Sequence, residues 1–209
     1  MIMKKFLVLS IASSWLGLMG FFAGPAEIVI SKVEGNCTIA KAEQYPKLAQ
    51  VGYTVDPKDV LSTYHQGTMD VTMKDSAGWR ILPRSACKIV RYDTHDLKLE
   101  LTKGNAIFNV KTLQWNRTFT VETPTAVAAV RGTQFWGRVD TDEIKTVRTT
   151  FAVREGEVAI TVKATGETRT LEKGDAIDIP YDETGKAVTL REATTDEMNA
   201  MAQASEIPV

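Results

Sequence analysis

From Glu27 to Pro180 the chain consists of short segments in which apolar and polar residues alternate with a period of two. Examples are EIVISKV (27–33), LKLELTKG (97–104) and EVAITVKA (157–164). This period places every second side chain on the same face of a β-strand, and the frequent β-branched residues favour strands. Gly, Asn, Asp and Pro separate the segments at intervals of roughly eight to twelve residues. The pattern predicts an all-β domain built as a sandwich, barrel or solenoid.

Two of these segments resemble each other, VEGNCTI (33–39) and REGEVAI (154–160). The similarity favours a structural repeat in which strands stack in successive layers and each layer buries the face of the next. The alternative is that short β-hairpins share such patterns by chance.

The C-terminal residues change from alternation to a helical pattern. Thr194 and Glu197 have the spacing of a capping box, in which each side chain bonds to a free backbone N–H group. We therefore expect a short helix over about 195–204, followed by a tail. Met198 and Met201 lie on one side of this helix, which either packs on the β body or lies loose.

The N-terminus has the order of an export signal. Lys4 and Lys5 precede an apolar stretch over 6–23, and small residues follow it up to Ala26. We expect cleavage after Ala26 and a periplasmic or extracellular location. The alternative is an uncleaved anchor, since the apolar stretch is just long enough to span a bilayer.

The predicted organisation thus has three parts: a signal peptide or uncleaved anchor (1–26), one β domain (27–190), and a short helix with a tail (191–209). The formal net charge is −1, which gives no reason to expect nucleic acid or an anionic membrane as a partner. Contact with a membrane is expected only through the N-terminal segment, if it is not cleaved.

The chain has two cysteines, Cys37 and Cys87. Both follow the export signal, and an exported protein meets an oxidising environment, so a single disulfide is our hypothesis. The alternative is a pair of buried thiols that pack as small hydrophobic side chains.

Catalytic motifs are missing from the sequence, and we predict a protein that is not an enzyme and that has no metal or other cofactor. His65 and His95 are the only histidines, which is too few for a multi-histidine metal site. The stretch YDTHD, with Asp93 and Asp96, reads as a polar turn. Carboxylates are plentiful, so a small hydrolase with paired carboxylates is retained as the weakest alternative.

The most unusual stretch is VETPTAVAAVRGTQFWGRV (121–139), which reads as two strands joined at a corner. Pro124 suits the start or the edge of a strand, and Gly132 allows the backbone to turn. If Arg131 points inward, it must pair with carboxylates or carbonyl groups, because an unpaired buried charge is very costly. We interpret Arg131 as a structural clamp, with an outward recognition residue as the alternative.

Four elements, in this order, resemble the FecR family of bacterial regulators. They are the run over 59–90 with its Leu-Pro-x-Ser step, the strand pair over 97–110, the corner over 119–139, and VREGEVAITV with LEKGDAIDI near the C-terminal end of the β region. The corner carries the most recognisable residues: Thr123, Pro124, Val130, Arg131, Gly132, Thr133 and Phe135.

The resemblance implies an antiparallel β-solenoid or sandwich-like domain in which the corner belongs to the scaffold. Family members that regulate sigma factors carry a cytoplasmic helical segment, a membrane helix and a domain that contacts a transporter. The present chain matches only the β domain, so we expect a stand-alone exported module and do not transfer the sigma-factor role.

We expect this module to bind another envelope protein, in a sensing or scaffolding role. The alternative is a carbohydrate- or cell-wall-binding module with a surface glycan as its partner. In that case exposed aromatic side chains would stack on sugar rings, and the candidates are Tyr64, Trp79, Trp115 and Trp136.

Overall fold

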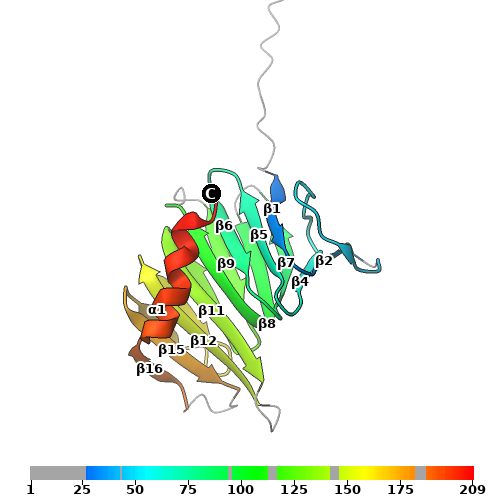
Figure 1. Cartoon of the computed structure of the whole chain (residues 1–209). Coiled ribbons are helices and arrows are strands. Elements are labelled where there is room, and N and C mark those ends of the chain that lie inside the picture. Colours follow the sequence, from blue (N-terminus) through cyan, green and yellow to red (C-terminus); the bar gives the residue numbers. More distant parts are fainter. Residues whose placement is uncertain (1–26, 43, 94–95, 113–116, 142–145, 182–186) are drawn as a thin grey trace, which may run out of the picture.

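The computed structural model describes residues 27–42, 44–93, 96–112, 117–141, 146–181 and 187–209. These residues form an all-β structure with one short helix near the C-terminus (Figure 1), which confirms the predicted fold class. The predicted signal segment lies outside the described residues and stays a prediction. Within the described ranges, no helix has the length and apolar character that a membrane span requires.

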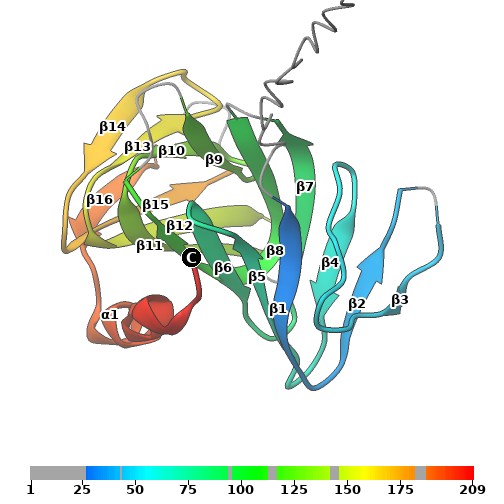
Figure 2. The ribbon, with the colours of Figure 1, turned by 90° about the horizontal axis from the view of Figure 1, so that it is seen from above.

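The strands form one continuous 16-stranded sheet that folds over so that its two halves face each other (Figure 2). We call the halves sheet A and sheet B. Sheet A contains, in spatial order, β1 (Ile28–Glu34), β5 (Thr68–Met73), β6 (Ala77–Ile81), the second part of β8 (Asp96–Val110), β11 (Thr133–Thr141), β12 (Val147–Glu155), β15 (Asp175–Pro180) and β16 (Thr189–Glu192).

Sheet B shares β8, whose first part belongs to it. In spatial order it contains β3 (Lys47–Leu48), β2 (Cys37–Ala40), β4 (Val60–Thr63), β7 (Ala86–Tyr92), β8, β9 (Thr118–Glu122), β10 (Ala126–Val130), β13 (Val158–Val162) and β14 (Thr168–Leu171). The chain crosses between the two sheets at corners on two opposite sides: the corners at Gly35 and Gly104 lie on one side, and those at Gly132 and Gly156 lie on the other.

The two similar segments found in the sequence are two of these corners. Gly35 joins β1 of sheet A to β2 of sheet B, and Gly156 joins β12 to β13 in the same way. Both glycines have positive φ, +64° and +81°. A Cβ atom at Gly35 would overlap the carbonyl of Gln66, and one at Gly156 would overlap the carbonyl of Gly132. The similarity therefore reflects a repeated corner that needs glycine.

The space between the sheets is filled by the apolar side chains that the alternation predicted. Phe108 and Phe135 stack at 4.6 Å between ring centroids, and Trp79 of sheet A meets Phe119 of sheet B edge-on at 6.4 Å. Such aromatic contacts bury large apolar areas, so this core fixes the two sheets against each other.

One strand pair departs from the antiparallel prediction. β8 and β9 run parallel, with Leu97 opposite Phe119, and every other pair described by the structure is antiparallel. The reason is the path of the chain: β8 ends in sheet A at Val110, and the chain then returns to sheet B at the end where β8 began.

The C-terminal helix follows β16, which ends at Glu192, two residues past the predicted domain boundary. α1 spans Thr195–Met201 and continues as the 3-10 helix η1 (Ala202–Glu206). The capping box of Thr194 and Glu197 is confirmed. The helix packs on the outer face of sheet A rather than lying loose (Figure 1).

Candidate functional site

The two threonines of the predicted corner motif are buried and hydrogen-bonded. Thr123 Oγ1 bonds to the carbonyl of Ala126 at 3.1 Å and accepts a hydrogen bond from Thr149 Oγ1 at 2.9 Å. Thr133 Oγ1 donates to the carbonyl of Glu157 at 2.9 Å. The bonds of Thr123 join the β9–β10 turn to β10 and β12, and the bond of Thr133 joins β11 to the β12–β13 corner, so both threonines hold the scaffold together.

The apolar residues of the motif belong to the same scaffold. Val130 and Phe135 are buried in the core, and Pro124 lies in the turn between β9 and β10. None of the three presents a group that can react chemically.

Arg131 does not act as a buried clamp, and that interpretation is wrong. Its side chain is exposed, and it forms no ion pair with any residue that the structure describes. The corner instead depends on Gly132, which has φ +75° and a backbone close to Thr112. Arg131 precedes the turn on its outer side, where water solvates the guanidinium.

The predicted disulfide between Cys37 and Cys87 is also wrong, because both cysteines are buried free thiols. Cys37 lies opposite Thr63, and Leu61 lies opposite Cys87, so β4 separates the two cysteine-bearing strands. Two strand spacings amount to about 9.5 Å, which exceeds the ~7 Å limit between the Cα atoms of a disulfide. Burial raises the pKa of Cys87 to about 12.

Two of the four aromatic residues proposed to stack on sugars are inaccessible. Trp79 lies in the core between the sheets, and Trp136 lies under α1. Tyr64 is exposed, whereas Trp115 lies outside the described residues. Neither of the two tryptophans that the structure describes can therefore stack on a sugar ring, which weakens the glycan-binding alternative.

The structure also places the polar stretch that includes Asp93 and Asp96. The backbone N–H of Asp96 donates to Asp93 Oδ1 at 2.9 Å, as in a turn, and Arg91 pairs with Asp96. His95 lies outside the described residues. Across the described ranges, no group of three or more His, Cys, Asp or Glu side chains has the arrangement of a metal site.

A group of exposed apolar side chains lies at the end of the stack that begins with β1 and β2. Residues 44–55, which we call the cap segment, run from the free edge of sheet B to the free edge of sheet A. The N–H of Ala49 donates to Cys37 of β2 at 2.9 Å, and the N–H of Ile30 on β1 donates to the carbonyl of Tyr53 at 2.9 Å. The cap segment thereby covers the edge of β1.

The inner side of the cap segment closes the core, because Ala49 and Val55 are buried within it. The outer side is apolar as well. Tyr45 is 93% exposed, Leu48 68% and Val51 62%. A terminal layer of a stacked β protein normally has a polar outer face that keeps it soluble, so this face is exceptional.

Lys41 fixes the base of the cap segment. Its Nζ lies 2.7 Å from Asp56, 2.8 Å from Asp59 and 2.8 Å from the carbonyl oxygen of Thr54. Burial opposes the charge on Lys41, but the hydrogen bonds to Asp56 and Asp59 outweigh burial and raise its pKa. This network joins Lys41, which precedes the cap segment, to Thr54 near the end of the segment and to the two aspartates that follow it.

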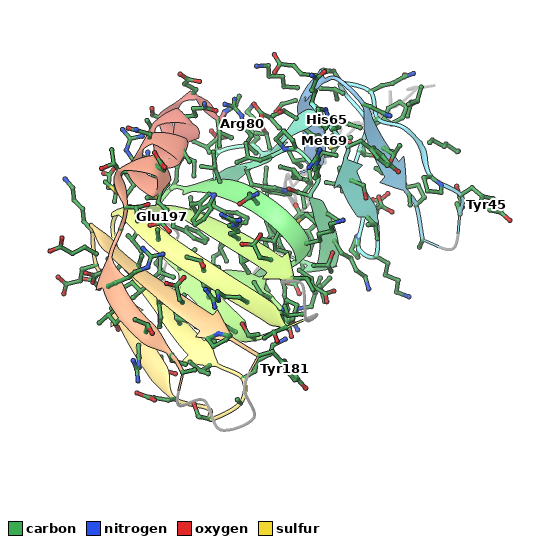
Figure 3. The ribbon with its side chains drawn as sticks, turned by 60° about the horizontal axis from the view of Figure 1, so that its bottom comes forward. Tyr45, His65, Met69, Arg80, Tyr181 and Glu197 are labelled. Carbon is green, nitrogen blue, oxygen red and sulfur yellow. The ribbon has the colours of Figure 1, made fainter. Side chains whose placement is uncertain are left out.

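A second apolar feature lies at the opposite end of the stack. It is a groove of ≈ 340 Å³ lined by Pro124, Thr125, Val162, Lys163, Ala164, Ile179, Pro180 and Tyr181. The hydroxyl of Thr125 is bonded to the carbonyl of Ile179 at 3.0 Å. The floor therefore presents few free polar groups, and Tyr181 projects into solvent beside it (Figure 3).

Sequence reasoning missed the cap segment. Its signal was present as a charge-poor stretch in which Lys47 is the only charged residue between 44 and 55. That stretch has no period of two and contains Pro46 and Gly52, so it reads as an ordinary loop. Exposure of its apolar side chains could be seen only in three dimensions.

Together, the layered sheets and the structural role of the corner motif define a class: an all-β scaffold built from two stacked sheets. The model of the family described as "FecR protein" matches residues 59–171, which is more than half of the chain. The protein belongs to the FecR family. The cap segment precedes the matched range.

Solved structures support the fold. The 2.50 Å crystal structure of "a putative anti-sigma factor" from Parabacteroides distasonis matches with a TM-score of 0.56 and 20% identity, and a 1.65 Å structure with the same description matches with 0.54 and 21%. Each match covers 69% of the present chain and 64% of the other, so the chain spans less than two thirds of these relatives. No curated protein matches the chain.

Proposed function

We propose that the protein is a non-enzymatic binding module of the bacterial cell envelope, with a sensing or scaffolding role, and that the outer face of the cap segment binds its protein partner. The observation that carries this proposal is the apolar surface of Tyr45, Leu48 and Val51 at the end of the stack. Family membership supports a regulatory role, because the solved relatives are described as anti-sigma factors.

The composition of the cap segment fits a protein interface. Interface cores are depleted in charged residues and enriched in tyrosine, and the cap segment has one charged residue, Lys47, beside Tyr45 and Tyr53. Exposed apolar patches that a monomer does not need are typical of interaction sites.

Binding occurs through side chains rather than by strand addition. β3 is only two residues long, follows Pro46 and begins with Lys47. Short length, proline and lysine are the features by which proteins protect a sheet edge from pairing with another strand. The partner therefore contacts the apolar side chains and leaves the strand edge unpaired.

Site-specific photocrosslinking in intact cells tests this proposal. A photoreactive amino acid in place of Leu48 is expected to yield one cross-linked envelope protein, and the combined substitutions Tyr45→Ser and Val51→Ser are expected to abolish it. Leu190 is the matched control, because it is also an exposed leucine but lies on β16, away from the cap segment.

Equal adducts at both positions, or none at position 48, would overturn the proposal. Capture of peptidoglycan or another glycan instead of a protein would support the carbohydrate-binding alternative, with the exposed tyrosines as the stacking residues. The substituted side chains are exposed, so their replacement is expected to change stability by less than about 0.5 kcal/mol.

A further inference from the structure

The C-terminal residues 195–209 lie across the outer face of sheet A (Figures 1 and 2), on the side of the molecule away from Tyr45 (Figure 3). α1 and η1 form the first part, and the last residues from Ile207 are extended. The segment buries Met201, Ala204 and Ile207. On sheet A these residues contact an apolar seat formed by Ile107, Trp136, Ala152 and Ala176.

Polar side chains around these apolar residues, which we count as part of the seat, donate hydrogen bonds to the backbone of this segment. Arg154 Nη1 donates to the carbonyl of Met201 at 2.7 Å, and Asn109 Nδ2 donates to the carbonyl of Ile207 at 3.3 Å. Thr72 Oγ1 donates to Pro208 at 3.3 Å, and Lys111 Nζ to Val209 at 2.9 Å. Donors that bind main-chain carbonyls recognise an extended peptide whatever its side chains are, as in peptide-binding domains.

Gly78 brings the backbone of the segment into direct contact with the sheet. A Cβ atom at Gly78 would overlap the carbonyl oxygen of Pro208 and would lie 2.8 Å from Cγ2 of Ile207. Gly78 has an ordinary extended backbone in β6, so its backbone conformation does not require glycine. The missing side chain instead makes room for the backbone of another segment to pack directly on the sheet.

The segment behaves as a ligand attached to the sheet rather than as part of the sheet. α1 has seven residues, fewer than the ~12–15 that an isolated helix needs to be stable in water. Its helical form therefore depends on the seat and on the Thr194 capping box. Dissociation of the segment leaves the hydrogen-bond ladder of sheet A intact, because the segment adds no strand to it.

The fit of the segment is incomplete at one position. The indole Nε1 of Trp136 is buried in the seat with no hydrogen-bond partner among the described residues. Buried N–H groups in proteins are nearly always paired, so this donor is available to a ligand that carries an acceptor at this point.

We propose that the outer face of sheet A is a binding site for a linear apolar peptide of a partner protein, and that residues 195–209 occupy this site as an intramolecular competitor. The peptide has apolar side chains at the positions of Met201 and Ile207, and an extended end whose main-chain oxygens accept from Thr72, Asn109 and Lys111. This site is separate from the cap segment and goes beyond the proposed function.

A peptide-binding experiment on the full chain tests this proposal. The probe is a fluorescently labelled synthetic peptide of residues 195–209, and its anisotropy reports binding. The substitutions Met201→Ser and Ile207→Ser weaken the attached segment and leave the seat unchanged. Attached segments compete at millimolar effective concentration, so we expect the probe to bind this variant at least about 100-fold more tightly than the unsubstituted protein.

Three controls make the result specific. Gly78→Ala, added to the weakened variant, is expected to abolish binding because its Cβ occupies the place of the peptide carbonyl. Asn109→Leu is a second seat variant that avoids any change at Gly78 and is expected to weaken binding about tenfold. A probe with Asp at the positions of Met201 and Ile207 is expected not to bind.

Hydrogen exchange of residues 195–206 shows whether the weakened segment leaves the seat. Release of the segment without binding of the probe would overturn the proposal, and so would equal binding to the Gly78→Ala variant. Persistent protection of the segment in the weakened variant would overturn its role as a competitor. The assay does not involve the cap segment, so its failure leaves the proposed function untouched.

Discussion

Arg80 on β6 and Asp70 on β5 form a two-point ion pair on the outer face of sheet A, with Nε to Oδ1 at 2.7 Å and Nη2 to Oδ2 at 2.8 Å. Both side chains are buried, with 7% and 2% of their surface exposed. Nη1 of Arg80 also donates to Gln203 Oε1 at 3.0 Å, so the pair lies where the C-terminal segment meets the sheet.

Removal of one partner of this pair is expected to be strongly destabilising. Arg80→Leu leaves the Asp70 carboxylate buried without its cation, which costs about 3–5 kcal/mol. The double substitution Arg80→Leu with Asp70→Leu removes both charges and is expected to recover most of that loss. Urea denaturation of the two variants measures the difference, and a double variant as unstable as the single one would contradict this expectation.

The close packing at the repeated corner predicts that Gly→Ala costs more stability at Gly156 than at Gly166, although the two glycines have similar backbone conformations. Gly156 and Gly166 have φ of +81° and +72°, but a Cβ atom would overlap a carbonyl only at Gly156 and would meet nothing within 4 Å at Gly166. Gly166→Ala is expected to cost about 1–2 kcal/mol for the left-handed conformation alone. Gly156→Ala should cost at least 1 kcal/mol more for the added overlap.

Thermal denaturation of both variants checks this prediction, because the conformational penalty is shared and cancels in the comparison. Equal losses of stability would mean that the corners tolerate a side chain. The stacking of successive corners would then contribute little to the fold.

The cysteines are expected to be unreactive in the folded protein and free in the unfolded one. Cys87 is fully buried and its pKa of about 12 keeps it protonated, and burial also raises the pKa of Cys37. Because the thiolate is the reactive form, a thiol reagent at neutral pH should modify neither residue in the native state. In denaturant without a reductant, two thiols per chain should react, whereas none would react if a disulfide were present.

The attachment of α1 is expected to weaken in acid. The hydrogen bond from Arg191 is the main cause that lowers the pKa of Glu197 below its ordinary 4.5. Since the pKa is lower in the folded state, the stabilisation is fully present above pH 4.5 and is lost as the pH falls through the folded-state pKa. Burial would raise the pKa of Asp178, but hydrogen bonds from Arg191 and Thr150 outweigh it, so Asp178 acts in the same direction.

Hydrogen exchange of residues 195–206 measures this effect: after correction for the intrinsic pH dependence of amide exchange, their protection factors should fall below pH 4.5 while the β core stays protected. Glu197→Gln keeps a capping side chain but removes the charge, so it should weaken the attachment at neutral pH by about 1 kcal/mol and reduce its pH dependence. An unchanged pH profile in this variant would assign the acid effect to other carboxylates.

The local elements were predictable because they depend on neighbours in the sequence. Alternation with a period of two identified the strands, as the buried Leu97, Leu99 and Leu101 of β8 illustrate. The capping box followed from the three-residue spacing of Thr194 and Glu197, which is a local hydrogen-bond pattern.

The roles of individual side chains at the corners were not predictable in the same way. The interpretation of Arg131 as a clamp required its side chain to point inward, but its position at the outer side of the turn leaves it in water. Cys37 and Cys87 face the same core yet lie two strand spacings apart, since the order of strands in a sheet differs from their order in the chain.

The sequence by itself therefore determined the strand content, the glycine corners and the capped helix, because each depends on periodicity or on contacts within a few residues. Only the tertiary structure decided which apolar side chains are covered. Leu48 and Met201 are both apolar in the sequence, but the first lies in the outermost layer of the stack, where no further layer follows, and the second lies between α1 and sheet A. Burial depends on which distant segments pack against each residue, and the local sequence does not record those contacts.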